Sequence, residues 1–565
     1  MSTTFAQIAI HLAPNDPYAP YVREVIEHAG LVASFTSEPL EDLLTHDVLV
    51  LVGRGEMVGT DRERIESWVM RGGQLVCVGS TWGFEKLLGV LPFENLSCSR
   101  ATTHPVPESP IWPNEARPAP VFGGTFAAAT DCEVWARLDH EFVGASRQQC
   151  LRGFAYFLAP HVGQTVAMMQ LGRAVAVDGI GPCDGSAELA DGQLLAEDGA
   201  ILDYELDRHP SEDGKHRVFG QPHADVLKEL LLSMIFRAAD ATAKAAALTW
   251  YWPENQEGAA VISVDCEEWN PDNVFRLKQV MDVSNVPAAW FVAAPGYALD
   301  VYRMIRRWDD EVGVLYEPTD VNGWMPERLR SQYLLVHRTS GVSKIVSVRT
   351  ARTRWEGYTD FYAMSDQAGT RVSMSKGGRQ PGTQGYLFGT CHLFHPLRRD
   401  GTPMFTAEIP NAIYCPGVVI PVNGMHTVVR NAALRNGCVS LTIPSTFGDY
   451  ENANIALKQM FLLAQQYRLK WMLPWQIQHF ERGRRSMRSA LVGPQTWELV
   501  GDVPMEGLTV MVTGTNRELQ FEGKRAVTRT VRRFGMEFTV ATLNLGAREQ
   551  IHVTFATGWA VERAA

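Results

Sequence analysis

The sequence lacks the features that mark several classes of protein. Basic residues are not in excess: 52 lysines and arginines against 63 aspartates and glutamates leave a formal net charge of −11. So acidic a chain does not offer the positive surface that attracts nucleic acids or anionic membranes. There is no apolar run as long as a membrane span, and the N-terminus lacks the basic and apolar regions of a signal peptide. We therefore expect a cytoplasmic protein with no nucleic-acid or membrane partner.

Cysteine is scarce and scattered. The nine cysteines include no Cys-x-x-Cys pair. Cys77, Cys266 and Cys438 lie within apolar runs that are typical of strands. This placement indicates reduced thiols in the core, which agrees with a cytoplasmic location.

The length of 565 residues predicts several domains. Residues 1–245 alternate apolar strand-like runs with amphipathic helical runs, which indicates a doubly wound parallel sheet of flavodoxin-like type. Residues 255–490 form a second α/β segment. Residues 495–565 show period-two alternation between glycine and asparagine turns, which predicts a small antiparallel β-sandwich.

The first segment has clear local signals. Residues 47–52 and 74–78 are near-continuous apolar runs and predict strands that are buried on both faces. Thr60 and Glu63 are spaced as a capping box at the start of a predicted helix. The run at 166–177 predicts a hairpin around a central glycine.

Three phrases of this segment resemble the class I glutamine amidotransferase-like fold: residues 47–53, 68–76 and 171–178. Enzymes of that fold carry a nucleophilic cysteine at a turn between a strand and a helix. Here Cys77 lies inside a strand-like run, and no Cys-His-Glu set is evident. We expect this domain to be non-catalytic.

The middle segment holds the sharpest functional signal. An apolar run from Val261 leads into three acids, Asp265, Glu267 and Glu268. Acids at the carboxyl end of a strand lie where α/β barrels place their chemistry, because the loops at that end form the open mouth. Asp265 also has a structural alternative, since it could pair with an arginine such as Arg349.

Several phrases of this segment, in order, resemble the polysaccharide deacetylases of the NodB-homology group. They are residues 263–269, 287–292, 311–317, 348–355, 405–410, 441–444 and 471–482. The resemblance implies a distorted (β/α) barrel and the deacetylation of an N-acetylated sugar with a divalent metal such as zinc. It assigns Asp265 as general base and Glu267 or Glu268 as the metal-binding carboxylate, and it places Glu268 and Arg349 in the catalytic set.

The sequence departs from that family where histidines are expected. Those positions read Leu315, Ala351 and Ile443, none of which can bind a metal. His392 and His395 could replace the lost ligands together with Glu267 or Glu268. A hard cation held by oxygen ligands is a further alternative, and its set would be Glu267, Glu317 and Asp320.

Tryptophans complete the set of candidates. If the resemblance holds, Trp269, Trp355 and Trp475 surround the barrel mouth, where aromatic faces suit sugar stacking. Three hypotheses follow. The first is a degenerate deacetylase that binds a glycan or serves as a scaffold subunit. The second is a divergent metal-dependent hydrolase of N-acetylated sugars. The third is a structural protein that assembles with a partner or with copies of itself.

Overall fold

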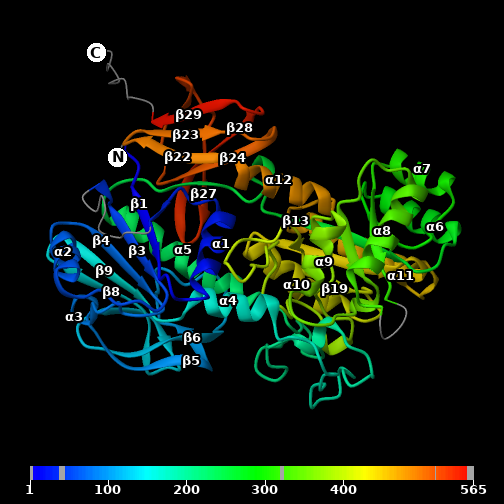
Figure 1. The fold of residues 1–565 in the computed structure, drawn as a ribbon, viewed down its shortest axis with the longest axis horizontal. Helices are drawn as coiled ribbons and strands as arrows, with labels where there is room; N and C mark the ends of the chain where they lie inside the picture. The colour runs from blue at the N-terminus through cyan, green and yellow to red at the C-terminus, as the bar shows by residue number, and fades with distance from the viewer. Residues whose placement is uncertain (1–3, 37–44, 319–322, 516, 556–565) are drawn as a thin grey trace. The chain divides into compact units, whose positions relative to one another are not determined.

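The computed structural model describes residues 4–36, 45–318, 323–515 and 517–555 (Figure 1). The chain forms two compact units, each built from distant segments. Unit 1 comprises Met1–Thr165, Leu227–Asn255 and Phe480–Ala565, and unit 2 comprises Val166–Val226 and Gln256–His479. The division at 245 and 495 expected from the sequence stays a prediction. Within the described residues, no helix is long and apolar enough to cross a bilayer.

Unit 1 contains a mixed sheet whose first part is parallel. Its strands lie in the order β2-β1-β3-β4-β9, the order of flavodoxin-like sheets. Their bounds are β1 Ile8–Leu12, β2 Ser34–Thr36, β3 Val48–Val52, β4 Gln74–Val78 and β9 Gly153–Leu158. Every residue of β3 and β4 is buried, as their apolar sequences predict.

Antiparallel strands extend this sheet in the order β8-β7-β5-β6. They are β8 Phe142–Cys150, β7 Glu133–Leu138, β5 Val90–Pro105 and β6 Ala119–Ala129. The helices of this unit include α1 Ala19–Ala29, α2 Gly59–Met70 and α3 Glu85–Leu88, and α5 His223–Ala241 contributes most of its length.

Two local predictions are wrong. The first half of the expected hairpin at 166–177 falls on a helix, α4 Val162–Leu171. The run is apolar on all sides and contains no turn before Gly172, so its pattern fits a buried helix as well as a strand. The expected capping box is also missing: α2 starts after Val58, and no side chain caps it.

Two antiparallel sheets form the C-terminal part of unit 1. One has the order β12-β24-β28-β27 and the other the order β22-β23-β29-β25-β26. Their bounds are β12 Ala247–Thr249, β22 Arg488–Gly493, β23 Thr496–Val500, β24 Met505–Thr513, β25 Leu519–Phe521, β26 Lys524–Arg525, β27 Arg529–Arg533, β28 Met536–Leu545 and β29 Gln550–Phe555. A shared apolar core, which includes Trp497, Val510 and Val553, joins the sheets.

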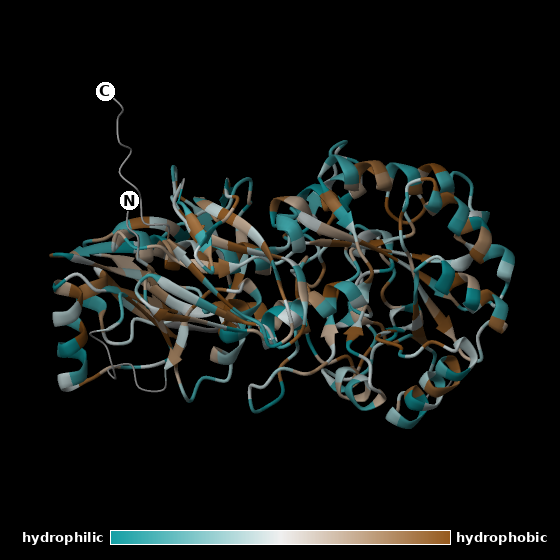
Figure 2. Ribbon diagram, turned by 90° about the horizontal axis from the view of Figure 1, so that it is seen from above, coloured by the Kyte–Doolittle hydropathy of each residue, from teal (hydrophilic) through white to brown (hydrophobic). Residues whose placement is uncertain are grey.

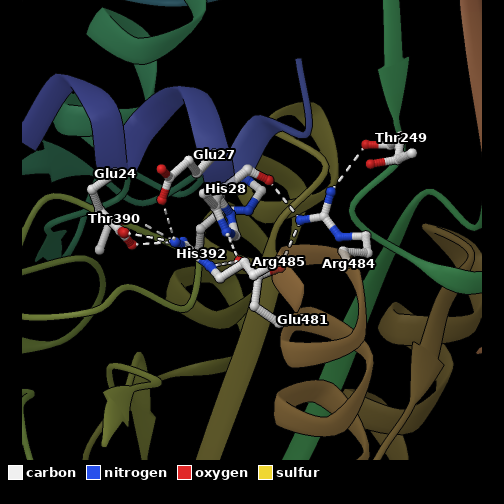
Figure 3. Close-up of polar contacts among 9 residues, drawn as sticks. All are labelled: Glu24, Glu27, His28, Thr249, Thr390, His392, Glu481, Arg484 and Arg485. Atoms are coloured by element: carbon white, nitrogen blue, oxygen red, sulfur yellow. Dashed lines mark hydrogen bonds and ion pairs between the residues drawn. The ribbon is translucent and has the colours of Figure 1, made fainter. Parts of the chain in front are cut away.

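A buried charge network links α1 to the end of α12 (Pro474–Ser486) within unit 1 (Figure 3). Glu481 accepts from Arg484 at 2.6 Å and from Arg485 at 2.7 Å, and its other close partner is His28 Nδ1 at 2.9 Å. Arg485 also makes a bidentate ion pair with Glu24, with hydrogen bonds of 2.7 and 2.8 Å. Nearby positive charge holds the pKa of Glu481 well below its usual range despite burial.

Unit 2 is built on one parallel sheet with the order β18-β17-β16-β15-β14-β13-β20-β19, and β21 also pairs with β13. The strands are β13 Gly258–Cys266, β14 Ala289–Ala293, β15 Glu311–Tyr316, β16 Ser347–Thr350, β17 Val372–Ser373, β18 Ala407–Glu408, β19 Ile413–Tyr414, β20 Cys438–Pro444 and β21 Leu469–Trp471. Its helices include α6 Pro271–Asp282, α7 Leu299–Arg307, α8 Pro326–Ser340, α9 Asp360–Ala368, α10 Val422–Leu434 and α11 Ala453–Gln466. The strand β13 is buried along its whole length, and the helices carry both hydrophilic and hydrophobic residues (Figure 2).

A long segment, residues 172–220, lies over the loops that follow β16 and β17. Gly357 exchanges both backbone hydrogen bonds with Val175, at 2.9 Å each. The N–H of Trp355 donates to Leu194 at 2.9 Å, and the N–H of Gly382 donates to Ser186 at 3.0 Å. The loops at the carboxyl edge of this sheet are therefore held in place by a segment from outside the sheet.

Candidate functional site

The carboxyl edge of β13 carries the candidate acid Asp265, which pairs with Arg349 of β16. Asp265 Oδ1 lies 3.2 Å from Arg349 Nε, and both side chains are buried. Strands β13 and β16 are separated by β14 and β15, so their axes would lie about 14 Å apart in a flat sheet. The close pair shows that the sheet curves around this edge as part of a barrel.

Burial and nearby charges of both signs act on the pKa of Asp265. Burial raises the pKa of Asp265 to about 6, with a further upward contribution from Glu267. Arg349 and Arg379 act in the opposite direction and lower the pKa. Asp265 therefore changes charge close to neutral pH.

Polar side chains form a floor beside this ion pair. Arg349 Nη1 donates to Thr442 Oγ1 at 2.6 Å, and Thr442 donates to Asn411 Oδ1 at 2.8 Å. Ser263 completes the group, 2.8 Å from Thr442. Among the described residues, Arg349 Nη2 and Asn411 Nδ2 find no hydrogen-bond partner although both are buried. Buried donors without partners are rare and point to an acceptor supplied from elsewhere.

A second group of charged side chains, less buried than Asp265, follows β13, β15 and β16. Glu267 lies 3.6 Å from Arg352, and it contributes, after burial, to raising the pKa of Glu317. Glu268 is exposed, and the hydroxyl of Tyr297 donates to its backbone carbonyl at 3.1 Å. Glu267 and Glu317 thus belong to one acidic group. Asp320, the third member expected from the sequence, lies outside the described residues.

Arg379 is a part of the site that sequence reasoning missed. The buried carboxylate of Glu197 accepts from the N–H of Arg379 at 2.9 Å and from Thr383 Oγ1 at 2.7 Å. Glu197 belongs to the segment 172–220, so this segment fixes the loop that carries Arg379. No motif marks Glu197 or Arg379. Thr442 and Asn411 were also missed: the register of β20 against β13 places Thr442 beside Ser263, and Thr442 bonds Asn411.

Trp355, expected to stack on sugar, lies in the core. It has no exposed surface, and the Nζ of Lys376 lies 4.6 Å from its ring. Burial raises the pKa of Glu408, and burial lowers the pKa of Lys376, which also donates to the carbonyl of Leu171 at 2.7 Å. Trp355 therefore has no free face for a ligand.

The candidate ligand His392 lies at the opposite end of the sheet. The N–H of Cys438 donates to the carbonyl of Cys391 at 2.7 Å, and Cys438 pairs with Ala259 at the start of β13. The strand between Ala259 and Asp265 is about 20 Å long. His392 and Asp265 are therefore not brought together. His395 contacts the carbonyl of Met404 through Nδ1, at 2.9 Å.

Trp475 also lies at the amino edge, because its N–H donates to Glu311, the first residue of β15, at 3.1 Å. Trp269 is the predicted tryptophan that stays at the carboxyl edge. Its indole donates to the carbonyl of Ala293 at 2.9 Å, and 45% of its surface is exposed. Of the three expected tryptophans, Trp269 alone offers a ring face beside the acids.

The two ends of the sheet in unit 2 differ in whether their side chains could bind a metal ion. Within the described residues, one set of three possible ligands exists, Asp225, Cys391 and His392, with ligand atoms within 4.8 Å of one another. Such a set has the chemistry that zinc prefers. The surroundings of Asp265 do not fit a transition metal. Leu315 and Ile443 are buried apolar side chains where the resemblance expects histidine.

Comparison with known proteins shows likeness to solved structures. No protein-family model matches the sequence. No curated protein matches it. The solved structures that resemble the chain include carbohydrate deacetylases.

Agd3, a carbohydrate deacetylase, is 7% identical, with 99% of each chain covered and a TM-score of 0.40. A protein from Mycobacterium smegmatis, provisionally assigned as a polysaccharide deacetylase, is 15% identical over 43% of this chain and 96% of its own, with a TM-score of 0.31. A β-galactosidase from Rahnella sp. R3 is 15% identical over 28% of this chain and 29% of its own, with a TM-score of 0.24. The chain spans less than a third of the length of the β-galactosidases it matches.

Proposed function

We propose that the protein is a deacetylase-like carbohydrate-binding protein that holds a glycan at the carboxyl edge of unit 2 without hydrolysing it. The observation that carries the proposal is the combination of buried, unpartnered donors on Arg349 and Asn411 with the exposed ring of Trp269 at the same edge. Sugars offer hydroxyl and acetamido oxygens to such donors and apolar faces to such rings.

The side chains around Asp265 argue for binding over hydrolysis. Arg349 holds the carboxylate in a buried ion pair and thereby offsets part of the rise in pKa that burial causes. No imidazole lies within reach among the contacts described for Asp265, so a leaving amine has no evident proton donor. The ion pair and the hydroxyls of Ser263 and Thr442 instead make a fixed polar surface for a ligand.

A divergent hydrolase is the second candidate, and one observation favours it. The pKa of Asp265 is about 6, close to the value at which a general acid or base works near neutral pH. This candidate predicts release of acetate from an N-acetylated oligosaccharide, which the binding proposal does not.

Calorimetric titration with N-acetylglucosamine oligomers, alongside an acetate assay, tests the proposal. We expect binding without acetate release, and weakening of about tenfold in Trp269→Ala. Asp265→Asn should also weaken binding, because the Arg349 charge loses its counterion. Trp475→Ala is the matched control: Trp475 is 40% exposed but lies at the other edge, so its removal should leave affinity unchanged.

Each outcome decides between the candidates. Acetate release that stops in Asp265→Asn would establish the hydrolase and overturn the binding-only proposal. Equal losses in Trp269→Ala and Trp475→Ala would overturn the assignment of the carboxyl edge. Absence of binding to every oligomer would overturn a carbohydrate function and leave the structural assembly hypothesis.

A further inference from the structure

A pocket opens beside the candidate site, between the loop after β14 and helix α8. Its cavity volume is about 690 Å³. The lining residues are Ala294, Pro295, Met325, Glu327, Arg328, Ser331, Gln332 and Leu335. A cavity of this size lies within the range that small-molecule sites occupy, about 300–1,000 Å³.

The lining mixes apolar and hydrogen-bonding groups in the way a sugar requires. Pro295, Met325 and Leu335 offer apolar surface, and each is exposed. Arg328, whose Nε donates to the carbonyl of Glu317 at 3.3 Å, and Ser331 bring a guanidinium and a hydroxyl group to the lining. A pyranose has an apolar C–H face and an equatorial rim of hydroxyls, so this lining matches both of its surfaces.

Two contacts link the lining of the pocket to the candidate site. The indole of Trp269 donates to Ala293, the neighbour of the lining residue Ala294, at 2.9 Å. Gln332 binds both backbone groups of Glu317: it accepts from the N–H at 3.0 Å and donates to the carbonyl at 2.7 Å. One wall of the pocket thus positions Glu317, a member of the acidic group.

The distance between the pocket and Asp265 sets the size of the ligand. Asp265 pairs in register with Phe291, and Ala294 comes three residues later in the chain. Three residues of extended chain span about 10 Å. One ligand that reaches both places must be longer than a single sugar ring.

We infer that this pocket is a second sugar-binding subsite, which takes a residue flanking the one held at Asp265, so that the ligand is an oligosaccharide or polysaccharide. The inference rests on the proposed function and adds the length of the ligand to it. Trp269 stands between the two places and serves both. Arg328 and Ser331 then determine how strongly longer chains bind.

The experiment compares N-acetylglucosamine with its linear oligomers of increasing length by calorimetry. In the unaltered protein, affinity should rise by at least about tenfold from the monosaccharide to the longer oligomers, or about 1.4 kcal/mol. Ser331→Trp fills the pocket and should abolish this gain while leaving the affinity for the monosaccharide unchanged. Arg328→Ala should reduce the gain. Arg330→Ala, an exposed arginine of the same helix outside the lining, is the control and should change nothing.

The outcomes separate the subsite from the proposed function. The subsite is overturned, and the proposed function stands, if the gain in affinity with length persists in Ser331→Trp. The same holds if the unaltered protein binds the monosaccharide without any gain for longer oligomers and Asp265→Asn loses that binding. If no oligomer binds the unaltered protein, both are overturned. A gain that only the pocket variants remove supports both.

Discussion

The two units each place a buried aspartate at the carboxyl edge of a parallel sheet, and the two aspartates differ in their partners. In unit 1, Asp16 follows β1 and accepts from the N–H groups of Tyr18 at 2.9 Å and Arg54 at 2.7 Å. His161, which follows β9, lies 2.7 Å from the same carboxylate. In unit 2, Asp265 has Arg349 beside it, and its Oδ1 makes no hydrogen bond among the described residues.

The difference extends to the partner residues. The second ring nitrogen of His161 accepts from the N–H of Gln164 at 3.1 Å in the first turn of α4. Both nitrogens of His161 are therefore used within the fold, and the Asp16–His161 pair resembles a catalytic dyad in composition only. Arg349 and Asn411 keep unpartnered donors. The comparison teaches that a carboxyl edge becomes a candidate site through hydrogen-bonding capacity that the fold leaves unused.

The largest effect that we expect is on stability, when Asp16 is removed from unit 1. We expect Asp16→Ala to cost about 3 kcal/mol of unfolding free energy, because buried donors lose their acceptor. Urea denaturation measures the loss. Asp61→Ala, an exposed acid in the first turn of α2, is the control and should change stability by less than about 0.5 kcal/mol. A cost for Asp16→Ala as small as that of the control would show that the satisfied edge does not stabilise unit 1.

The two aspartates should also differ in how they make stability depend on pH, because the pKa of one is raised and the pKa of the other is lowered. The pKa of Asp265 is raised from 3.8 to about 6, so the folded state binds its proton more tightly than the unfolded state. Stability from this group therefore rises as pH falls through 6, by about 1 kcal/mol between pH 7 and pH 5. His161 and backbone donors hold the pKa of Asp16 low despite burial, so its contribution is present above pH 4 and is lost in stronger acid.

Asp265→Asn isolates this smaller effect. The variant should lack the gain between pH 7 and pH 5 that urea denaturation detects in the unaltered protein. Asp16→Asn should keep that gain, because Asp16 is ionised in both states throughout this window. Identical pH profiles for Asp265→Asn and the unaltered protein would contradict the raised pKa.

Sequence reasoning predicted those parts of the fold in which one pattern decides one structure. The apolar runs of β3, β4 and β13 predicted buried strands, and the structure confirms them. The place of Asp265 at the end of β13 also followed, because strand ends can be read from the sequence, whereas its pairing with Arg349 was one alternative that the structure now shows. The run at 166–177 fitted both a helix and a hairpin, and packing decided for the helix α4.

The rest of the site depends on topology that local patterns do not contain. Thr442 contacts Ser263 because β20 lies beside β13, which is 170 or more residues away in the chain, and Asn411 reaches Thr442 because β19, which follows it, pairs with β20. His392 was predicted as a replacement metal ligand beside Glu267 or Glu268 because spacing says nothing about which end of the sheet a loop occupies. Trp355 was expected at the mouth, but it packs against Trp324, Phe361 and Tyr362, and its backbone N–H donates to Leu194 of the distant segment 172–220.

The smallest effect that we expect concerns metal, and it sharpens the separation of the two ends of unit 2. Asp225, Cys391 and His392 offer a zinc-type ligand set at the amino edge, whereas Glu267 stands at the carboxyl edge without histidine beside it. After incubation with zinc and desalting, elemental analysis should find zinc that Cys391→Ser loses and Glu267→Gln retains. Sugar affinity should change by less than about twofold on chelation, because Cys391 lies at the amino edge of the sheet, about 20 Å of strand away from Asp265. Loss of zinc in Glu267→Gln, or loss of sugar binding on chelation, would place the metal at the carboxyl edge of unit 2 and would support metal-dependent hydrolysis there.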